Sequence, residues 1–255
     1  MNNSIAICRK ELKSYFSSPI AYLLMTMYAV LFGFFFWNAV GYFVNISFQS
    51  TMMGRSFPMD VNEMIIRPLL MNTSVIGLFL IPLISMRLFA EEKRTGTIEL
   101  LFTSPVRDLE IIIGKWLAAL ILYACLLGVS ALNIAFLFAY GQPDWRPLLV
   151  GYLGLLLQAG SLLAVGAFIS TTTRNQIIAG GVTFGACLLL WVLEWVAGYE
   201  TATWATVLGY MSVVRHYEPF SKGVIDTKDA VYFASLIFFG LFLTARSLES
   251  LRWRA

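Results

Sequence analysis

The sequence predicts an all-α integral membrane protein with six transmembrane helices. Of its 255 residues, 58% are hydrophobic and 13% are charged, and the mean hydropathy is +0.74. Soluble domains carry about 25% charged residues, so this composition is typical of a chain embedded in lipid. A helix needs about 20 apolar residues to cross a bilayer. Six stretches meet this need, the last being the shortest: 20–44, 69–89, 111–140, 147–169, 176–197 and 230–245.

The first 18 residues predict an amphipathic helix in the membrane interface. Apolar residues recur there at spacings of three and four, namely Ile5, Cys8, Leu12 and Phe16. Basic residues occupy the other faces, and Pro19 then turns the chain into the membrane. The alternative is a frayed basic tail. A cleaved signal peptide does not fit, because the following uncharged run spans residues 20–54 and exceeds the roughly 7–15 apolar residues of such signals.

The distribution of basic residues predicts the orientation of the six spans. Short cytoplasmic loops carry an excess of lysine and arginine. One side holds 12 of them and the other holds 6. The first set is Arg9, Lys10, Lys13, Arg87, Lys93, Arg94, Arg107, Lys115, Arg174, Arg246, Arg252 and Arg254; the second is Arg55, Arg67, Arg146, Arg215, Lys222 and Lys228. We therefore expect both termini to be cytoplasmic.

Two segments on the outer side are long enough to contain short helices. Residues 45–68 join the first two spans, and residues 198–229 join the last two. The second segment carries Trp204, Tyr210 and Phe220, and we expect these to pack against the membrane or the other spans. No flexible linker or convincing repeat interrupts the chain, so residues 1–255 are predicted to form a single domain.

The composition argues against several other classes of protein. A net charge of +3 is too small to indicate a nucleic-acid partner. The three cysteines are widely spaced and the only histidine is His216, so no metal site is predicted. His216 has no evident neighbour to fix its geometry, and we therefore expect no catalysis from it.

Few polar residues lie inside the predicted spans. Asn133, Gln158 and Glu194 could line a path or hold helices together, and packing is the commoner role. Glu194 lies close to the outer end of its span and is expected to reach the interface. Gly181 and Gly185 form a GxxxG pattern, which allows close helix approach within one subunit or between two.

A charged stretch between the second and third spans contains a short predicted helix. In "RLFAEEKRTGTIELLFTSPVRD", residues 87–108, an apolar face recurs at i, i+3, i+4 and i+7 over Ile98, Leu101, Phe102 and Pro105. Thr97 is a suitable N-cap, Gly96 allows a sharp turn, and Lys93 is expected on an exposed rim. The alternative is a helix resting on lipid headgroups, which the nearby glutamates disfavour.

The same stretch resembles a loop of a known transporter family. "FAEEKRTGTIELLFTSPV" followed by "GKWLAA" is similar to the loop between the second and third spans of ABC-2-type transporter permeases. The similarity is greatest to the subgroup of the gliding-motility-associated and nitrous-oxide-reductase maturation permeases. The pattern E-x-x-x-G-T-x-E-x-L falls on Glu92, Gly96, Thr97, Glu99 and Leu101. "HYEPFSKGVIDTKDAVYF", residues 216–233, extends the resemblance towards the last span.

The resemblance implies that residues 90–108 form a coupling loop. In that family the loop docks on a separate cytoplasmic ATPase, and the first and fifth spans meet their counterparts in a dimer. The residues implied in coupling are Glu91, Glu92, Arg94, Gly96, Thr97, Ile98, Glu99, Leu101, Phe102 and Pro105. The chain itself has no GxxxxGK[ST] phosphate loop, so no cofactor is expected on it. ATP and Mg²⁺ are expected in two copies of the ATPase.

The function predicted from these features is export by a permease subunit in the bacterial inner membrane. The subunit would pair with a second permease subunit, either identical or related. The alternative is a mechanotransmitter, which relays ATPase motion to an extracytoplasmic partner without moving a substrate. A polar central passage would favour transport, and a sealed apolar seam would favour the alternative. An intramembrane enzyme lacks a paired nucleophile and base. The substrate is not encoded in any motif.

Overall fold

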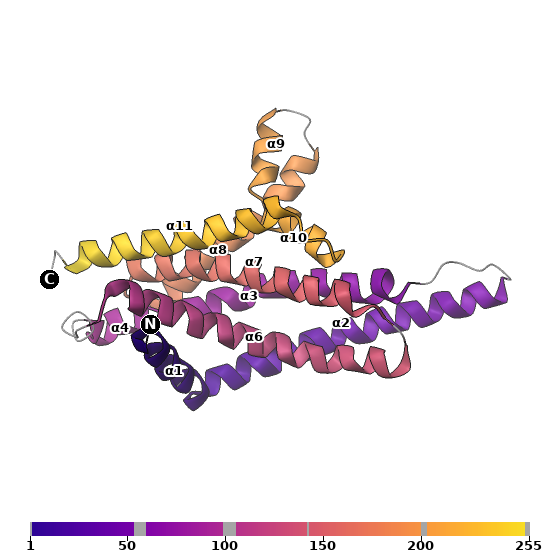
Figure 1. Ribbon diagram of the computed structural model, residues 1–255, viewed down its shortest axis with the longest axis horizontal. Coiled ribbons are helices and arrows are strands. Elements are labelled where there is room, and N and C mark those ends of the chain that lie inside the picture. The colour runs from indigo at the N-terminus through magenta and orange to yellow at the C-terminus, as the bar shows by residue number, and fades with distance from the viewer. Residues whose placement is uncertain (1, 54–59, 99–105, 142, 200–202, 253–255) are drawn as a thin grey trace.

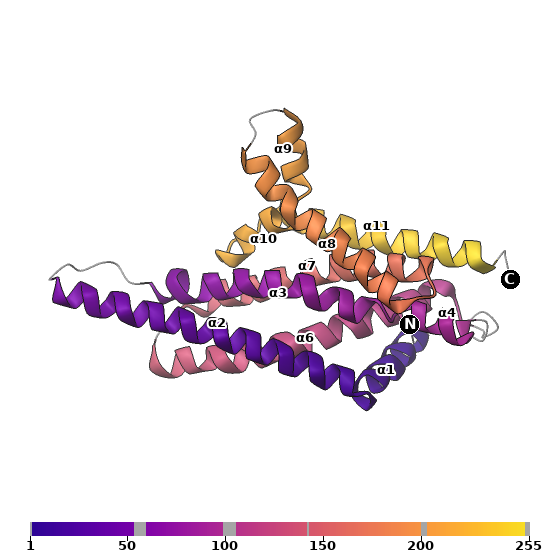
Figure 2. The ribbon, with the colours of Figure 1, turned by 180° about the vertical axis from the view of Figure 1, so that it is seen from behind.

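All the regular elements in the described part of the chain are helices (Figure 1). The computed structural model describes residues 2–53, 60–98, 106–141, 143–199 and 203–252. Six of its helices are long and apolar enough to cross a membrane, which confirms the predicted fold class. The two chain ends and α4 (Ala90–Thr95) lie toward one end of the bundle, and the last turns of α2 (Pro19–Met52) lie toward the other (Figures 1 and 2).

The N-terminal helix α1 (Asn2–Ser17) packs against α6 (Asp108–Tyr140). Gly114 makes this approach possible, because a Cβ there would lie 2.8 Å from the carbonyl oxygen of Ser4. The buried residues of α1 are Cys8 and Tyr15. Of the face predicted from spacing, Leu12 and Phe16 are partly buried, whereas Ile5 is exposed. The helix was therefore predicted correctly, but its packed face is rotated towards Tyr15.

The first two spans begin and end at identifiable residues. Ser18 caps α2, because its side chain accepts a hydrogen bond from the Ile20 N–H at 3.4 Å. A π-helical turn, η1 (Asn62–Ile66), leads into α3 (Arg67–Ser85), so the outer segment 45–68 contributes to both spans. Pro82 lies inside α3, and the α-helix ends three residues later, at Ser85. A proline has no N–H to donate and crowds the preceding turn, so Pro82 perturbs the helix before it, while its own carbonyl still accepts a hydrogen bond from the Met86 N–H at 3.0 Å.

The fourth span, α7 (Trp145–Thr172), lies at the centre of the bundle (Figures 1 and 2). It packs against α3, α6, α8 (Gln176–Tyr199), α10 (Val213–Ser221) and α11 (Thr227–Arg252). Small residues permit these contacts. A Cβ on Gly240 of α11 would lie 2.8 Å from the Ala164 backbone of α7, so these two helices meet almost backbone to backbone.

The segment before the last span contains two short helices, as predicted. α9 (Thr203–Tyr210) stands out from the side of the bundle, whereas α10 lies against α7 (Figure 1). Phe220 of α10 is fully buried, in agreement with the prediction. Trp204 and Tyr210 are both exposed in the single chain, but the Tyr210 ring meets that of Tyr232 in the last span edge to face, with ring centroids 6.3 Å apart.

Candidate functional site

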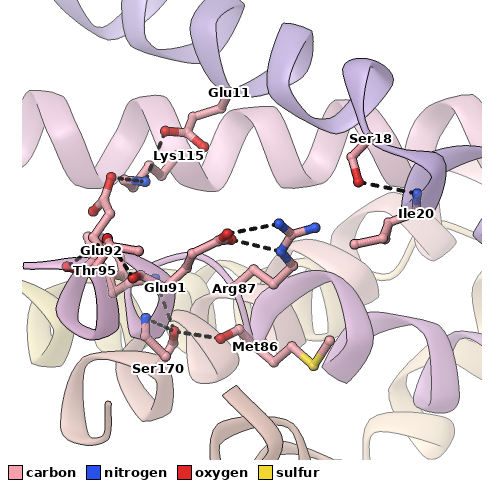
Figure 3. A network of polar contacts seen from close by, with 12 residues as sticks. Glu11, Ser18, Ile20, Met86, Arg87, Glu91, Glu92, Thr95, Lys115 and Ser170 are labelled. Carbon is pink, nitrogen blue, oxygen red and sulfur yellow. Dashed lines mark hydrogen bonds and ion pairs between the residues drawn. The ribbon is translucent and has the colours of Figure 1, made fainter. Parts of the chain in front are cut away.

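The described part of the charged stretch, residues 87–98, forms a short arm that leaves the bundle after α3. The regular α-helical hydrogen bonding is interrupted between Ser85 and Ala90, and Ser170 of α7 bridges the interruption (Figure 3). The N–H groups of Phe89 and Ala90 both donate to Ser170 Oγ at 3.0 Å, and Ser170 Oγ donates to the Met86 carbonyl at 3.2 Å. A buried hydroxyl therefore joins the arm to the central helix where the arm lacks its own hydrogen bonds.

A buried lysine ties the arm to two further helices. Lys115 of α6 contacts Glu92 of α4 at 2.8 Å and Glu11 of α1 at 3.0 Å (Figure 3). All three side chains are largely buried. The other carboxylate oxygen of Glu92 is buried and has no hydrogen-bond partner among the described residues. Since each charge has lost most of its hydration, the cluster depends on the lysine being present.

The flanking charges of the arm also have partners within the chain. Arg87 binds Glu91 through two hydrogen bonds, at 2.8 and 3.0 Å. The ammonium of Lys93 donates to the carbonyl of Thr171 near the C-terminal end of α7, where a cation is favourable. Lys93 is half-buried, so the expectation of an exposed rim position was wrong. The exposed basic residue of the arm is Arg94.

Gly96 closes α4 in a left-handed conformation. Its φ is +75°, a value that residues with a Cβ rarely adopt, which confirms the predicted need for glycine. Thr97 is exposed, its hydroxyl lies 2.9 Å from that of Thr95, and Ile98 packs partly against the core. The remaining residues predicted for coupling, Glu99, Leu101, Phe102 and Pro105, lie outside the described residues.

Two pairs of polar side chains join different spans inside the chain. Ser74 donates to Gln158 Oε1 at 2.9 Å, and the hydroxyls of Ser130 and Tyr152 are 2.8 Å apart. Asn133 is half-buried. Gln158 therefore joins α7 to α3 within one chain, a contact of the packing kind considered from the sequence.

The GxxxG face of α8 is open. A Cβ on Gly181 or Gly185 would meet nothing within 4 Å, so this pattern is not used for packing inside the described chain. The neighbouring Gly180 does pack internally, because its Cβ position lies 3.2 Å from the sulfur of Met86. The two glycines thus offer a smooth surface on the outside of the bundle.

Three polar contacts order the outer helices. Ser212, the N-cap of α10, donates to Glu194 of α8 at 3.1 Å. Glu218 binds Lys222 and also Arg67 of α3, at 2.8 and 3.2 Å. The pKa of Glu218 is lowered, chiefly by the hydrogen bond from Lys222. Glu194, which was expected to reach the interface, is therefore part of the junction between α8 and α10.

His216 does have neighbours that fix its geometry, contrary to the expectation from sequence. It is buried, and its two ring nitrogens contact Asp229 of α11 and the carbonyl of Tyr210. No group of three or more His, Cys, Asp or Glu side chains in the described residues could hold a metal ion. The pair is a separate feature at the opposite end of α11 from the arm.

Sequence reasoning missed Lys115, Glu11, Ser170 and Asp229. A charge is costly inside an apolar helix, so Lys115 within the predicted span 111–140 was a signal for a buried anionic partner. Which anion would meet it could not be read, because Glu11 and Glu92 are far from it in sequence. Ser170 gave no signal, since small hydroxyl residues are common in spans.

Comparison with known families identifies the chain. Residues 5–244 match the model of the ABC-2 family transporter protein, and a search of curated proteins found no match. Membrane permeases of this family generally lie in the lipid bilayer and work with an ATPase partner. The match covers almost the whole chain and agrees with its six apolar helices. This multi-pass membrane protein therefore belongs to the ABC-2 transporter family.

Proposed function

We propose that the chain is the permease subunit of an ATP-driven exporter in the bacterial inner membrane. The observation that carries this proposal is the family match over residues 5–244, together with a charged arm anchored at one end of the bundle. Export and the bacterial membrane rest on the resemblance of residues 87–108 to the gliding-motility and nitrous-oxide-reductase maturation subgroup. ATP and Mg²⁺ belong to the partner ATPase, since the chain has no phosphate loop.

The arm end of the bundle is proposed to face the cytoplasm. The basic residues are biased 12 to 6 towards the side that carries both termini and the arm. The two termini and α4 lie toward the same end of the bundle, which fits an even number of crossings (Figure 1). A cytoplasmic ATPase can reach the arm only in this orientation.

The arm is proposed to carry ATPase motion into the membrane through two attachments. Ser170 and Thr171 connect it to the central helix α7, and Lys115 connects it to α1 and α6. A load applied just beyond Gly96, at residues 97–105, would reach all three helices through buried hydrogen-bonded contacts. Buried contacts transmit displacement better than exposed ones because close-packed interiors yield little.

A second permease subunit is proposed to contact the open face of α8. Gly181 and Gly185 meet nothing in the described chain, and the surrounding residues Val182, Leu188 and Leu189 are exposed and apolar. In a bilayer, close helix approach at small residues drives association through packing. Two permease subunits would then serve two copies of the ATPase.

The test of ATPase coupling is the replacement of Leu101 by aspartate. If the apolar face of 97–105 docks on the ATPase, the buried unpaired charge costs several kcal/mol, and each 1.4 kcal/mol is about tenfold in affinity. Co-purification of the ATPase should therefore fall by orders of magnitude while membrane insertion is kept. Lys13→Gln is the matched control, since Lys13 is an exposed charge of α1 outside the residues implied in coupling. Undiminished co-purification of the aspartate variant would refute docking through this face.

Mechanotransmission remains the second candidate, and one observation favours it. The Ser74 hydroxyl donates to Gln158 Oε1 inside one chain, and the open α8 face is apolar. A dimer sealed by that face would offer no polar passage. Crosslinking from α9 separates the two candidates: capture of an extracytoplasmic protein whose activity needs ATP hydrolysis supports mechanotransmission. ATP-dependent efflux by the purified complex alone supports export.

A further inference from the structure

His216 and Asp229 form a buried pair at the junction of α10 and α11. Their side chains are 3% and 2% exposed, and His216 Nδ1 lies 2.6 Å from Asp229 Oδ1. On the other side of the ring, Nε2 lies 2.8 Å from the Tyr210 carbonyl oxygen. The imidazole stacks on Tyr232 with ring centroids 3.8 Å apart. The ring is thus held on both edges and on one face.

The two hydrogen bonds of the ring require two protons. A carbonyl oxygen only accepts, so Nε2 must carry a proton towards Tyr210. Neutral histidine has one ring proton, so Nδ1 would then face the Asp229 carboxylate lone pair to lone pair at 2.6 Å. That contact becomes attractive only if one more proton lies between the two groups. The two contacts of the ring therefore require one proton more than a neutral histidine and an ionised aspartate carry together.

The burial of the pair also indicates an additional proton, because an unbalanced charge is costly away from water. An ionised Asp229 beside a neutral ring would bury a net negative charge, and its Oδ2 is buried without a hydrogen-bond partner in the described residues. Titratable and charged groups on the elements packed around the pair include Tyr210 on α9, Arg215, Tyr217 and Glu218 on α10, Lys228 and Tyr232 on α11, Asp226 just before α11, Arg146 and Tyr152 on α7, Arg67 on α3, and Glu194 on α8. The ammonium of Lys228 is mostly exposed and binds Asp226 at 2.9 Å. In the described residues, the ion-pair partner of Asp229 is His216.

The surroundings place the extra proton on the histidine. Asp229 is in the first turn of α11, where the helix dipole stabilises a negative charge. Tyr232 presents its ring face to the imidazole, which stabilises a cation. These two contacts favour an imidazolium bound to a carboxylate over a neutral ring bound to a carboxylic acid.

We propose that His216 and Asp229 constitute a proton-binding site that fastens the outer helices to the last span. When the proton leaves, the junction of α10 with α11 opens. The site is far from the arm and does not depend on the ATPase proposal, so its failure would leave that proposal untouched.

The sign of the pH dependence follows from the proton count. When the junction is open, free histidine loses its proton above about pH 6.5 and aspartate stays ionised. Closing the junction above that pH takes up one proton, and below it no proton is exchanged. Junction stability is therefore full in mild acid and falls as pH rises. The ratio of open to closed junction should increase about tenfold per pH unit while the closed pair keeps its proton.

The first test reads the proton directly. His216 is the only histidine in the chain, so ¹⁵N-histidine labelling of the full protein with a histidine-free tag gives one imidazole signal set. At about pH 8, where free histidine is neutral, both ring nitrogens should be protonated. Asp229→Asn is the matched control. Its amide can donate to Nδ1 while Nε2–H donates to Tyr210, so both contacts persist with a neutral ring. A neutral ring beside an ionised Asp229 in the wild type would overturn the proposal.

The second test measures the opening of the junction between α10 and α11. Spin labels at two exposed uncharged positions, Met211 before α10 and Val231 in α11, report the junction distance in a cysteine-free chain. From about pH 6 to about pH 10 the wild-type distribution should shift to longer distances, whereas Asp229→Asn should stay closed. His216→Ala should be open throughout. If wild type and Asp229→Asn behave alike at every pH, the site does not control the junction.

Discussion

Replacing Lys115 by methionine should destabilise the protein more than any single change to its two partners. Methionine keeps much of the side-chain volume but removes the ammonium that lies 2.8 Å from Glu92 and 3.0 Å from Glu11. Lys115 is 3% exposed, Glu92 15% and Glu11 18%. Two carboxylates would then face each other out of water, with no cation between them.

The size of the effect follows from this burial. Removing one partner from a buried ion pair costs about 3–5 kcal/mol. The partial exposure of both glutamates allows some rehydration, so we expect the lower end, about 3 kcal/mol. This corresponds to roughly two orders of magnitude in the unfolding equilibrium. Glu11→Gln leaves Lys115 paired with Glu92 and should cost only about 1 kcal/mol, the net value of a typical hydrogen bond.

Reversible unfolding in mixed detergent micelles measures both variants. The triple variant Glu11→Gln, Glu92→Gln, Lys115→Met removes all three charges and should recover much of the loss, because an uncharged buried cluster carries no desolvated ion. Equal stability of Lys115→Met and Glu11→Gln would refute the reasoning, since it would mean that the lysine does not compensate two buried charges.

Three further predictions concern the open glycine face, the outer ion pair and the orientation. Gly185→Leu should abolish subunit pairing in crosslinking without loss of folding, whereas Gly240→Leu should strongly destabilise the chain because its Cβ would lie 2.8 Å from the Ala164 backbone. Retained pairing of the first variant would exclude this face. Because the pKa of Glu218 is lowered in the folded protein, its carboxylate contributes stability that is present above about pH 4.5 and is lost as the pH falls through the folded-state pKa. The loss of thermal stability in acid should therefore be smaller in Glu218→Gln than in the wild type. Identical acid profiles of the two proteins would argue against this contribution. Cysteines at Lys222 and Arg252 should label from opposite sides of the membrane, and labelling of both from outside would rule out six crossings.

Sequence patterns predicted the elements of this fold because each element depends on nearby residues. The apolar runs placed all six spans, since backbone groups in lipid must be satisfied within a helix. Pro19 marked the start of α2, and Gly96 marked a left-handed turn that glycine readily adopts. The apolar spacing of residues 1–18 predicted a helix, although its packed face was set by Gly114 of α6.

The sequence by itself determined that this is a six-span membrane protein with a charged arm between its second and third spans. Only the tertiary structure decided which charges meet: Lys115 with Glu11 and Glu92, and His216 with Asp229. A helix pattern records which face is apolar, but it does not record which distant helix will cover that face. Pairing of buried charges depends on that packing, because each ion must find its partner where helices far apart in sequence come together.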